Sequence, residues 1–416
     1  MSLRVLFVES SVGGVGGSLH SLWTLVSHLD QQEIQAEILV FQEKPFWDRF
    51  RERGIPVHVW GNAGCYRAGK TAPEDVGGEI SQPTEGSRQA AVALTVPGSA
   101  ARLSQPAWWR ALSGLWRLIR EDLPLAWRLT RLVRSRRISI LHANDRLGSN
   151  RFVTLAGWLS GCPVVQHERL VGPYGWTDVW LSGWLSETLC VSRQVAEAIR
   201  GMGHRGRSIR VVPNGVELPP ERGQTRVAGR PRVGIVGRLV AWKGQDLFLE
   251  AMGRLAGHDT QPLFLIIGAA PPGNEGYAAR LEDMARQPPL EGRVEFSGHV
   301  DDPLAAIASL SVLVVASRTP EPFGRTVVEA MGQGIPVVVP AAGGPAEVVD
   351  HGETGLHYPP GDAISLAQAV ERLLDDPALA RTMSERGRQV VSEQYRPEDQ
   401  ARTVSGIYHH LIPGEA

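Results

Sequence analysis

The chain has 416 residues, enough for two domains at roughly 100–200 residues per domain. Hydrophobic residues make up 43% of it and charged residues 21%, which excludes a disordered chain, and the 43 basic and 44 acidic residues nearly cancel, which excludes nucleic-acid binding through a global charge. The cysteines Cys65, Cys162 and Cys190 lack zinc or disulfide spacing, and no stretch reaches the roughly 18 apolar residues of a membrane span. The composition predicts a globular, cytoplasmic protein of two domains.

The first half of the chain has the alternating pattern of a parallel α/β sheet. It predicts a helix over 19–29, after a glycine-rich turn at 10–17, and strands at 4–8, 36–41, 138–141, 163–165 and 188–191. Residues 61–107 lack any apolar period and are interpreted as a long flexible insertion. Together these features predict an N-terminal domain over residues 1–218.

Helical spacing resumes over residues 108–137, and Pro124 is predicted to separate two helices there. Four tryptophans (Trp108, Trp109, Trp116 and Trp127) are interleaved with arginines 110, 117, 120, 128, 131, 134, 136 and 137. Two interpretations stay open. The favoured one is a pair of amphipathic helices that cover the first sheet with arginine on the solvated face. The other is a peripheral contact with the inner face of a membrane, which would admit a lipid-linked acceptor.

A second alternating series begins after a Pro- and Gly-rich linker at 219–230. It predicts strands at 232–236, 262–267, 294–296, 312–315 and 335–339, and helices at 245–255, 277–284, 304–310 and 325–332. A C-terminal domain over 231–395 follows, and the helix in 396–416 is expected to pack back on the first domain. The fold class is thus α/β, with two Rossmann-like doubly wound domains facing across a cleft fed by the carboxyl ends of both sheets.

Two cations follow the first strand of the second half. Arg238 and Lys243 leave the end of the strand at 232–236 together with Gly237, where a guanidinium and an ammonium can both reach a diphosphate. The chain has only three lysines, at 44, 70 and 243, against 40 arginines. Solvation on a loop would explain Arg238 alone, but it is a poorer explanation of the rare Lys243.

A pair of carboxylates is the second motif. Pro322 disfavours a helical backbone at Glu321, which places Glu321 in a turn, whereas Glu329 lies about one turn into the next helix. The amides of residues 323–326 between them form a helix N-terminus, which favours phosphate. Carboxylates accept hydrogen bonds from sugar hydroxyls, so this string predicts a site for a phosphorylated sugar.

Glycine loops and histidines supply further candidates. The segment 298–300 would suit the edge of a nucleobase, and 343–344 is as well explained by a plain turn as by a ligand loop. The loop with Gly14 and Gly16 is out of register with Gly-x-Gly-x-x-Gly, because Leu19 stands at the third glycine. His142 and His167 follow predicted strands on the cleft side. His167 is a candidate for catalysis, and His142 and Asp145 are candidates for acceptor binding.

Together these segments resemble the retaining, nucleotide-sugar-dependent glycosyltransferases of family 4, which have the GT-B fold. The resemblance rests on 237–239 with 243–244, 321–324 with 329–331, 343–344 and 212–216, including seven residues between Glu321 and Glu329. It implies that Arg238 and Lys243 hold the diphosphate, Glu329 the ribose, Glu321 the donor sugar, and His167 the sugar near the reacting carbon. The other expected nucleotide-sugar contacts are Gly14, Gly16, Gly237, Gly298, His299, Val300, Phe323, Gly324, Arg325 and Thr326. The insertion at 61–107 departs from the usual length of the family.

The expected reaction moves a sugar from a UDP-, GDP- or ADP-sugar to an acceptor hydroxyl on a glycan, a glycolipid or a small molecule. No Asp-x-Asp follows an apolar strand, so the site is expected to need neither a metal nor a cofactor. Two alternatives remain. A nicotinamide-dependent dehydrogenase would need an acidic ribose ligand after the second strand, where Glu43 is a poor candidate. A non-catalytic sugar-nucleotide-binding protein would bind without transfer.

Overall fold

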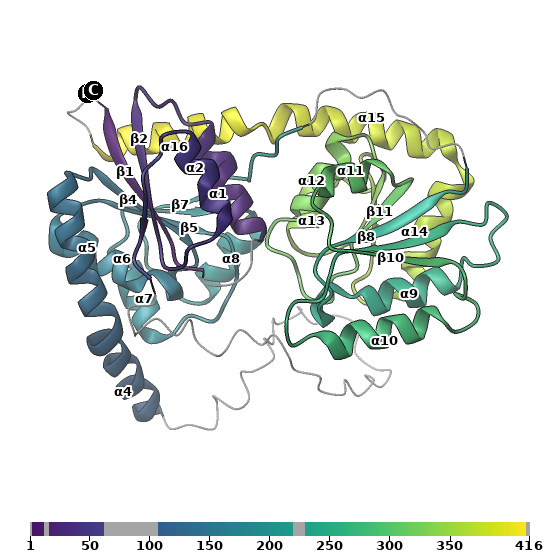
Figure 1. Cartoon of the computed structure of the whole chain (residues 1–416), viewed down its shortest axis with the longest axis horizontal. Coiled ribbons are helices and arrows are strands. Elements are labelled where there is room, and N and C mark those ends of the chain that lie inside the picture. Colours follow the sequence, from purple (N-terminus) through teal and green to yellow (C-terminus); the bar gives the residue numbers. More distant parts are fainter. Residues whose placement is uncertain (1, 12–15, 62–106, 219–228, 413–416) are drawn as a thin grey trace.

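The computed structural model describes residues 2–11, 16–61, 107–218 and 229–412. Two α/β domains lie side by side, and the helices near the C-terminus run from the second domain back across the first (Figure 1). The two predicted sheets are both present, so the predicted fold class is confirmed. Of the sequence-derived features, the loop with Gly14, nearly all of the insertion at 61–107 and most of the linker lie outside the described residues.

The first sheet has seven parallel strands in the described part of the chain, in the order β3-β2-β1-β4-β5-β6-β7. They are β1 (Leu3–Glu9), β2 (Ile34–Val40), β3 (Val57–Val59), β4 (Ile140–Asp145), β5 (Val164–Glu168), β6 (Glu187–Cys190) and β7 (Ile209–Val211). Side chains alternate along β1, so Val5 and Phe7 face one layer of helices while Leu6 and Val8 face the other. Both faces are therefore covered, as a parallel sheet requires.

The helices of this domain are α1 (Gly17–Ser27), α2 (Asp48–Glu52), α4 (Ala107–Arg117), α5 (Leu123–Arg136), α6 (Leu147–Ser160), α7 (Trp176–Ser182) and α8 (Arg193–Gly201). The prediction that Pro124 separates two helices is wrong. The chain stays helical from Ala107 to Arg136, through a π-helical turn at Leu118–Asp122. That π turn ends at Asp122, and Pro124 lies in the first turn of α5 directly after it.

The second sheet repeats the strand order of the first, as β10-β9-β8-β11-β12-β13. Its strands are β8 (Arg232–Val236), β9 (Leu263–Ile267), β10 (Val294–Gly298), β11 (Val312–Val314), β12 (Val337–Pro340) and β13 (Leu356–Tyr358). The helices around it are α9 (Gln245–Gly253), α10 (Glu275–Ala285), α11 (Pro303–Ala308), α12 (Arg325–Gly332), α13 (Gly343–Val348), α14 (Ala363–Asp375) and α15 (Pro377–Gln394). In both sheets the order of the connections reverses beside the first strand, which is where such sheets bind ligands.

The last helix, α16 (Pro397–Leu411), belongs structurally to the first domain. Its residues Val404, Ile407 and Tyr408 are buried in the same cluster as the α1 side of the first sheet. The chain passes from one domain to the other twice, once after Val216 and once after Tyr395. The two connecting segments are in contact, because Val216 N donates to Tyr395 O at 2.9 Å. A carboxylate joins the domains elsewhere: Glu347 in α13 accepts from the amides of Arg193 and Gln194 at the start of α8, at 2.8 and 2.6 Å. The carboxylate thus pairs with the partial positive charge of a helix N-terminus in the other domain.

Candidate functional site

The loops that follow β8 and β11 meet, because these strands are neighbours in the second sheet. Lys243 ends a short 3₁₀ turn (Ala241–Lys243), and Gly244 follows with a φ of 70°. A Cβ at Gly244 would lie 2.0 Å from the carbonyl oxygen of Ala316, two residues after β11, so only glycine allows this approach. Arg318 N then donates to Trp242 O at 2.8 Å. The loop with Lys243 is therefore fixed against the loop with Glu321.

Lys243 and Glu321 form an ion pair in the structure. Lys243 Nζ lies 2.7 Å from Glu321 Oε1, and Ser317 Oγ donates to the same carboxylate oxygen. The exposed fractions of the two charged side chains are 19% and 9%. A half-buried ammonium with one carboxylate partner keeps donor capacity for a further anion, because an ammonium has three N–H groups.

The glycines at 343 and 344 support the Glu321 turn from behind. Gly344 N donates to Glu321 O at 2.7 Å, and a Cβ there would lie 2.3 Å from Phe323 Cα. Gly343 has a φ of 83°, and a Cβ there would lie 2.8 Å from Glu321 O. Of the two interpretations of this pair, the structure gives a packing role: the glycines hold the turn that presents Glu321.

Glu329 lies behind the start of α12. Arg325 Nε lies 2.6 Å from Glu329 Oε1, one helical turn along, and the Glu329 side chain is 8% exposed. Gly324 precedes the helix with a φ of 86°, and no side chain in the described part of the chain caps α12. The first amides of a helix have no partner inside it. The two carboxylates thus lie on either side of a helix start, each paired with one cation.

Other predicted nucleotide contacts lie around this centre. Arg238 is exposed beside Gly237, and its carbonyl oxygen accepts from Gln245 Nε2 at 2.8 Å. Gly298 ends β10 at a shift in register with a φ of 64°, and the His299 side chain after it is 81% exposed. The next residue, Val300, is half-buried and packs on the core. Thr326 in α12 is also half-buried. Phe323 is buried against Tyr395, with ring centroids 6.0 Å apart.

The polar ends of the first sheet differ from the prediction. His142 and His167 lie inside β4 and β5 rather than after them, because the polar residues continue the parallel pairing through Asp145 and Glu168. His142 is fully buried, with its Nδ1 2.6 Å from Tyr408 Oη in α16. No part of its side chain is accessible in this arrangement, so acceptor binding by His142 stays a prediction that the observed burial disfavours.

His167 is also fully buried in this arrangement. Its Nδ1 lies 3.3 Å from His142 Nε2 and 3.4 Å from Arg169 Nη2, while its Nε2 has no partner among the described residues. Burial, and then the Arg169 guanidinium, hold the pKa of His167 well below its usual range. The imidazole is therefore neutral at physiological pH. Its contact with a sugar stays a prediction, and it requires access to Nε2.

Arg169 organises a buried polar network at this sheet end. Its Nε donates to Asn144 Oδ1 at 2.6 Å, and its Nη1 donates to Asn214 Oδ1. Asn144 in turn donates to Glu9, the last residue of β1. Burial lowers the pKa of Arg169 to about 10, which leaves it charged at neutral pH. Sequence reasoning did not single out these four residues, although Asn214 lies within the quoted segment 212–216.

Asp145 is the predicted acceptor residue that the structure marks as unusual. It is a non-glycine residue with a φ of 83°, it is buried, and its Oδ1 has no partner in the described part of the chain. Burial, and then the charge of Glu9, raise its pKa. Strained backbone of this kind concentrates at functional sites. Acceptor binding by Asp145 stays a prediction that these observations favour.

Arg325 connects the two halves of the site. Two side chains of the first domain have pKa values that burial lowers first and the charge of Arg325 lowers further. They are His20 in α1, whose pKa falls to about 4, and Arg169. Gly16 directly precedes α1, four residues before His20. The loop ends of the two sheets therefore face each other around Arg325.

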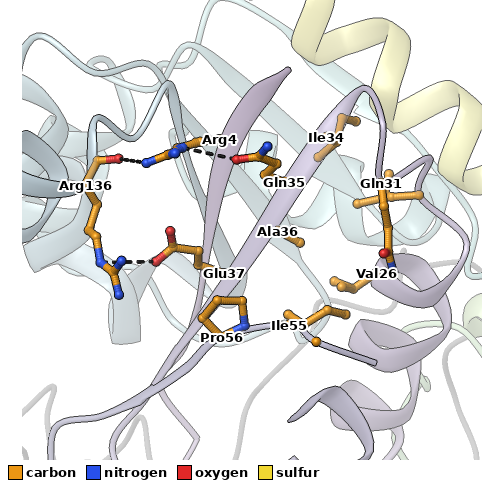
Figure 2. Close-up of a pocket in the computed structure, with 12 residues that line it drawn as sticks. Arg4, Val26, Gln31, Ile34, Gln35, Ala36, Glu37, Ile55, Pro56 and Arg136 are labelled. Carbon is orange, nitrogen blue, oxygen red and sulfur yellow. Dashed lines mark hydrogen bonds and ion pairs between the residues drawn. The ribbon is translucent and has the colours of Figure 1, made fainter. Parts of the chain in front are cut away.

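A surface pocket of about 270 Å³ lies elsewhere, at the opposite ends of the first-sheet strands (Figure 2). Its charged side chains already have partners: Arg4 donates to Gln35 and to Arg136 O, and Glu37 lies 2.6 Å from His58. Parallel sheets bind ligands at the carboxyl ends of their strands, so this pocket is not the candidate site. Within the described ranges no group of three His, Cys, Asp or Glu is arranged to hold a metal, and no helix is long and apolar enough to cross a membrane.

Known proteins share both halves of this molecule. Residues 220–390 match the family model "Glycosyl transferases group 1", and residues 46–218 match "Glycosyltransferase Family 4". The structure of Anabaena Alr3699/HepE in complex with UDP has a TM-score of 0.75 and 22% identity over 98% of this chain and 100% of that one. Together with the two Rossmann-like sheets, this likeness shows that the chain has the GT-B fold of glycosyltransferases.

Sequence relatives define the family within that class. The chain is 30% identical to glycogen synthase of Mycobacterium tuberculosis over 304 residues, which are 68% of this chain and 71% of the relative. It is 32% identical to the lipopolysaccharide core biosynthesis mannosyltransferase LpcC of Rhizobium leguminosarum over 211 residues, 49% of this chain and 60% of that one. The chain belongs to family 4 of the glycosyltransferases, as its motifs indicated.

Proposed function

We propose that this protein transfers a sugar from a nucleoside diphosphate sugar to an acceptor hydroxyl, with retention of configuration and without a metal. One observation carries the proposal: Lys243, Arg325 and the first amides of α12 converge with the carboxylates Glu321 and Glu329 at the switch point of the second sheet. Diphosphate, ribose and hexose each find complementary groups there.

The cations act on the leaving group. Breaking the glycosyl phosphate bond leaves negative charge on the diphosphate, and preorganised positive groups stabilise that charge as it develops. Lys243 is held 2.7 Å from Glu321, so an incoming diphosphate would compete with the carboxylate for the ammonium and leave Glu321 to accept a sugar hydroxyl. We assign the diphosphate to Lys243 and Arg238, the sugar to Glu321, and the ribose to Glu329. These cations and the helix start supply the charge that a metal would otherwise provide.

Retention follows if the leaving phosphate assists the acceptor hydroxyl on the same face of the sugar. The acceptor would enter from the first domain, where Asp145 and the buried network around Arg169 lie at the facing sheet end. A glycan or a lipid-linked sugar is the proposed acceptor class, in line with the core-biosynthesis function in the name of the relative LpcC. The two described cysteines, Cys162 and Cys190, are buried and free, which fits a reducing, cytoplasmic location.

Thermal unfolding with candidate donors tests the proposal. UDP-glucose, GDP-mannose and ADP-glucose are each added to the full chain, and the matched donor should stabilise it by about 2.7 kcal/mol at one hundred times its Kd. The stabilising donor should then lose its sugar to water or to an acceptor, measured by release of nucleoside diphosphate. Stabilisation by NADH alone would favour a dehydrogenase, and binding without any release of diphosphate would favour a non-catalytic sensor.

A further inference from the structure

The long helix formed by α4, the π turn and α5 has apolar side chains on two opposite sides. On the inner side, Leu125, Leu129 and Val133 are buried against the first sheet. On the outer side, five apolar side chains follow one another at intervals of three or four residues and are exposed: Leu112, Trp116, Ile119, Leu123 and Trp127. We call this outer row the α4–α5 ridge. Only the inner row explains the predicted role of these helices in covering the sheet.

The ridge is unusual for a helix facing water. The exposed fractions of Trp116, Ile119 and Trp127 are 57%, 55% and 56%. In Figure 1, α4 projects below the body of the first domain. Large apolar side chains gathered on one exposed face mark a surface that contacts another phase or molecule.

Positive charge surrounds the ridge. Seven arginines between 112 and 137 are exposed: Arg117, Arg120, Arg128, Arg131, Arg134, Arg136 and Arg137. The same segment has two acidic residues, of which Glu121 lies 3.7 Å from Arg117, while Asp122 is buried against Arg151. The segment therefore has a strong local excess of positive charge, although the whole chain has a net charge of −1.

The arginines also stack on the exposed tryptophans. Arg131 lies 3.5 Å from the ring centroid of Trp127, and Arg120 lies 5.3 Å from that of Trp116. Indole rings beside guanidinium groups suit the headgroup level of a bilayer, where the ring enters the boundary of the acyl chains and the cation meets lipid phosphate. This pairing of an apolar row with flanking cations is complementary to one surface in particular, that of an anionic membrane.

We propose that the α4–α5 ridge docks on an anionic lipid surface, with the apolar row in the interface and the arginines on the phosphates. A second copy of the chain is a poorer occupant, because a symmetric contact would place one set of arginines against the other. Docking does not depend on the proposed transfer reaction. If that reaction holds, docking brings the first domain, which would receive the acceptor, to a membrane that contains lipid-linked sugars.

Vesicle flotation with the full chain tests the docking. Vesicles of phosphatidylcholine with phosphatidylglycerol should retain the protein at low salt, and vesicles of phosphatidylcholine alone should retain much less. The triple variant L112Q/W116Q/I119Q should lower partition into the anionic vesicles by about tenfold or more. Ile364→Gln is the matched control, since Ile364 is 51% exposed on α14 in the other domain, and it should leave partition unchanged.

A charge variant makes the test independent of the apolar one. Arg120→Gln with Arg131→Gln should weaken partition and reduce its dependence on salt, because two phosphate contacts are lost. The proposal is overturned if the unaltered chain ignores anionic vesicles, or if the triple variant keeps its unfolding midpoint and binds them as before. It is equally overturned if sedimentation shows a dimer that the triple variant dissociates, without vesicle binding. Thermal protection by a sugar nucleotide is measured separately, so a failure of docking is distinct from a failure of the transfer reaction.

Discussion

The ends of the two sheets have the same topology but differ in how their charged groups are placed. In the second sheet, Lys243 and Arg325 are partly exposed, and each pairs with a single carboxylate. In the first sheet, Arg169 is buried at the centre of a network that includes Asn144 and Asn214. In each pair of the second sheet the cation keeps an exposed part that a ligand can reach, whereas a fully buried network is costly to disturb. The second domain is thus suited to exchanging charged ligands, and the first to holding a fixed surface.

Of the substitutions considered, Lys243→Ala should have the largest effect on donor use by the second domain. The change removes a cation from the proposed diphosphate site and leaves Glu321 as a buried carboxylate without its ammonium partner. We expect kcat/KM for the sugar donor to fall by about 10²–10³-fold, the usual cost of removing one transition-state stabilising group. The measurement is steady-state release of nucleoside diphosphate.

Arg280→Ala is the control for Lys243. Arg280 is 67% exposed in α10 and lies 3.9 Å from Asp246, outside the ion pairs of the site. Its removal should leave kcat/KM within about twofold, as expected for an exposed pair. Equal losses in the two variants would show that the general positive charge of the domain, rather than Lys243, acts on the donor.

The sequence predicted the second domain and its site more fully than the first. Strand β8 and helix α12 begin and end where the periodicity placed them, and Glu321 and Glu329 lie on either side of a helix start. These predictions are local, because a proline, a glycine and a helical period each fix nearby backbone. The burial of His142 is not local. It depends on Tyr408, which is 266 residues away in the chain, and no periodicity connects them.

Glu329→Ala removes one carboxylate of the site and leaves the cations Lys243 and Arg325 in place, so it separates the role of the carboxylate from that of the cations. In the proposed role Glu329 accepts from ribose hydroxyls, and a hydrogen bond to a charged group is worth about 1.5–3 kcal/mol. We expect donor KM to rise by about 10–100-fold, with a smaller effect on kcat, because the ribose is remote from the reacting carbon. Glu329→Gln keeps one acceptor oxygen, so its donor KM should lie between those of the unaltered chain and Glu329→Ala. An unchanged KM in both variants would refute the ribose role.

The pH dependence of stability tests whether Glu168 is buried and protonated in the first domain. Burial raises the pKa of this carboxyl to about 8, while in the unfolded chain it is about 4.3. The folded state therefore holds a proton that the unfolded state has lost, and stability falls as pH rises toward 8. His142 and His167 have lowered pKa values and are neutral in the folded state, while in the unfolded chain only a minor fraction is charged above pH 7, so they add a small slope of the opposite sign that shrinks toward pH 8.

Urea unfolding at pH 7 and pH 8 measures this effect. The unaltered chain should lose up to about 1.4 kcal/mol per pH unit from Glu168, with Asp145 acting in the same direction because its pKa is also raised. Glu168→Gln should flatten the slope while keeping an oxygen for the amide of Leu147 and the hydroxyl of Tyr174. Glu295→Gln, at a carboxylate 55% exposed in β10, is the control. An equal slope in all three proteins would contradict a protonated Glu168.

Tyr408→Phe makes the smallest change, and it separates a structural role for His142 from a chemical one. The variant loses one buried hydrogen bond, 2.6 Å long, between α16 and β4, which should cost about 1 kcal/mol in urea unfolding. Donor KM and kcat should stay the same, because the pair lies inside the first domain, away from the ion pairs of the second. If kcat fell while stability held, the chain of Tyr408, His142 and His167 would act on the reaction, and the fixed network would belong to the catalytic machinery after all.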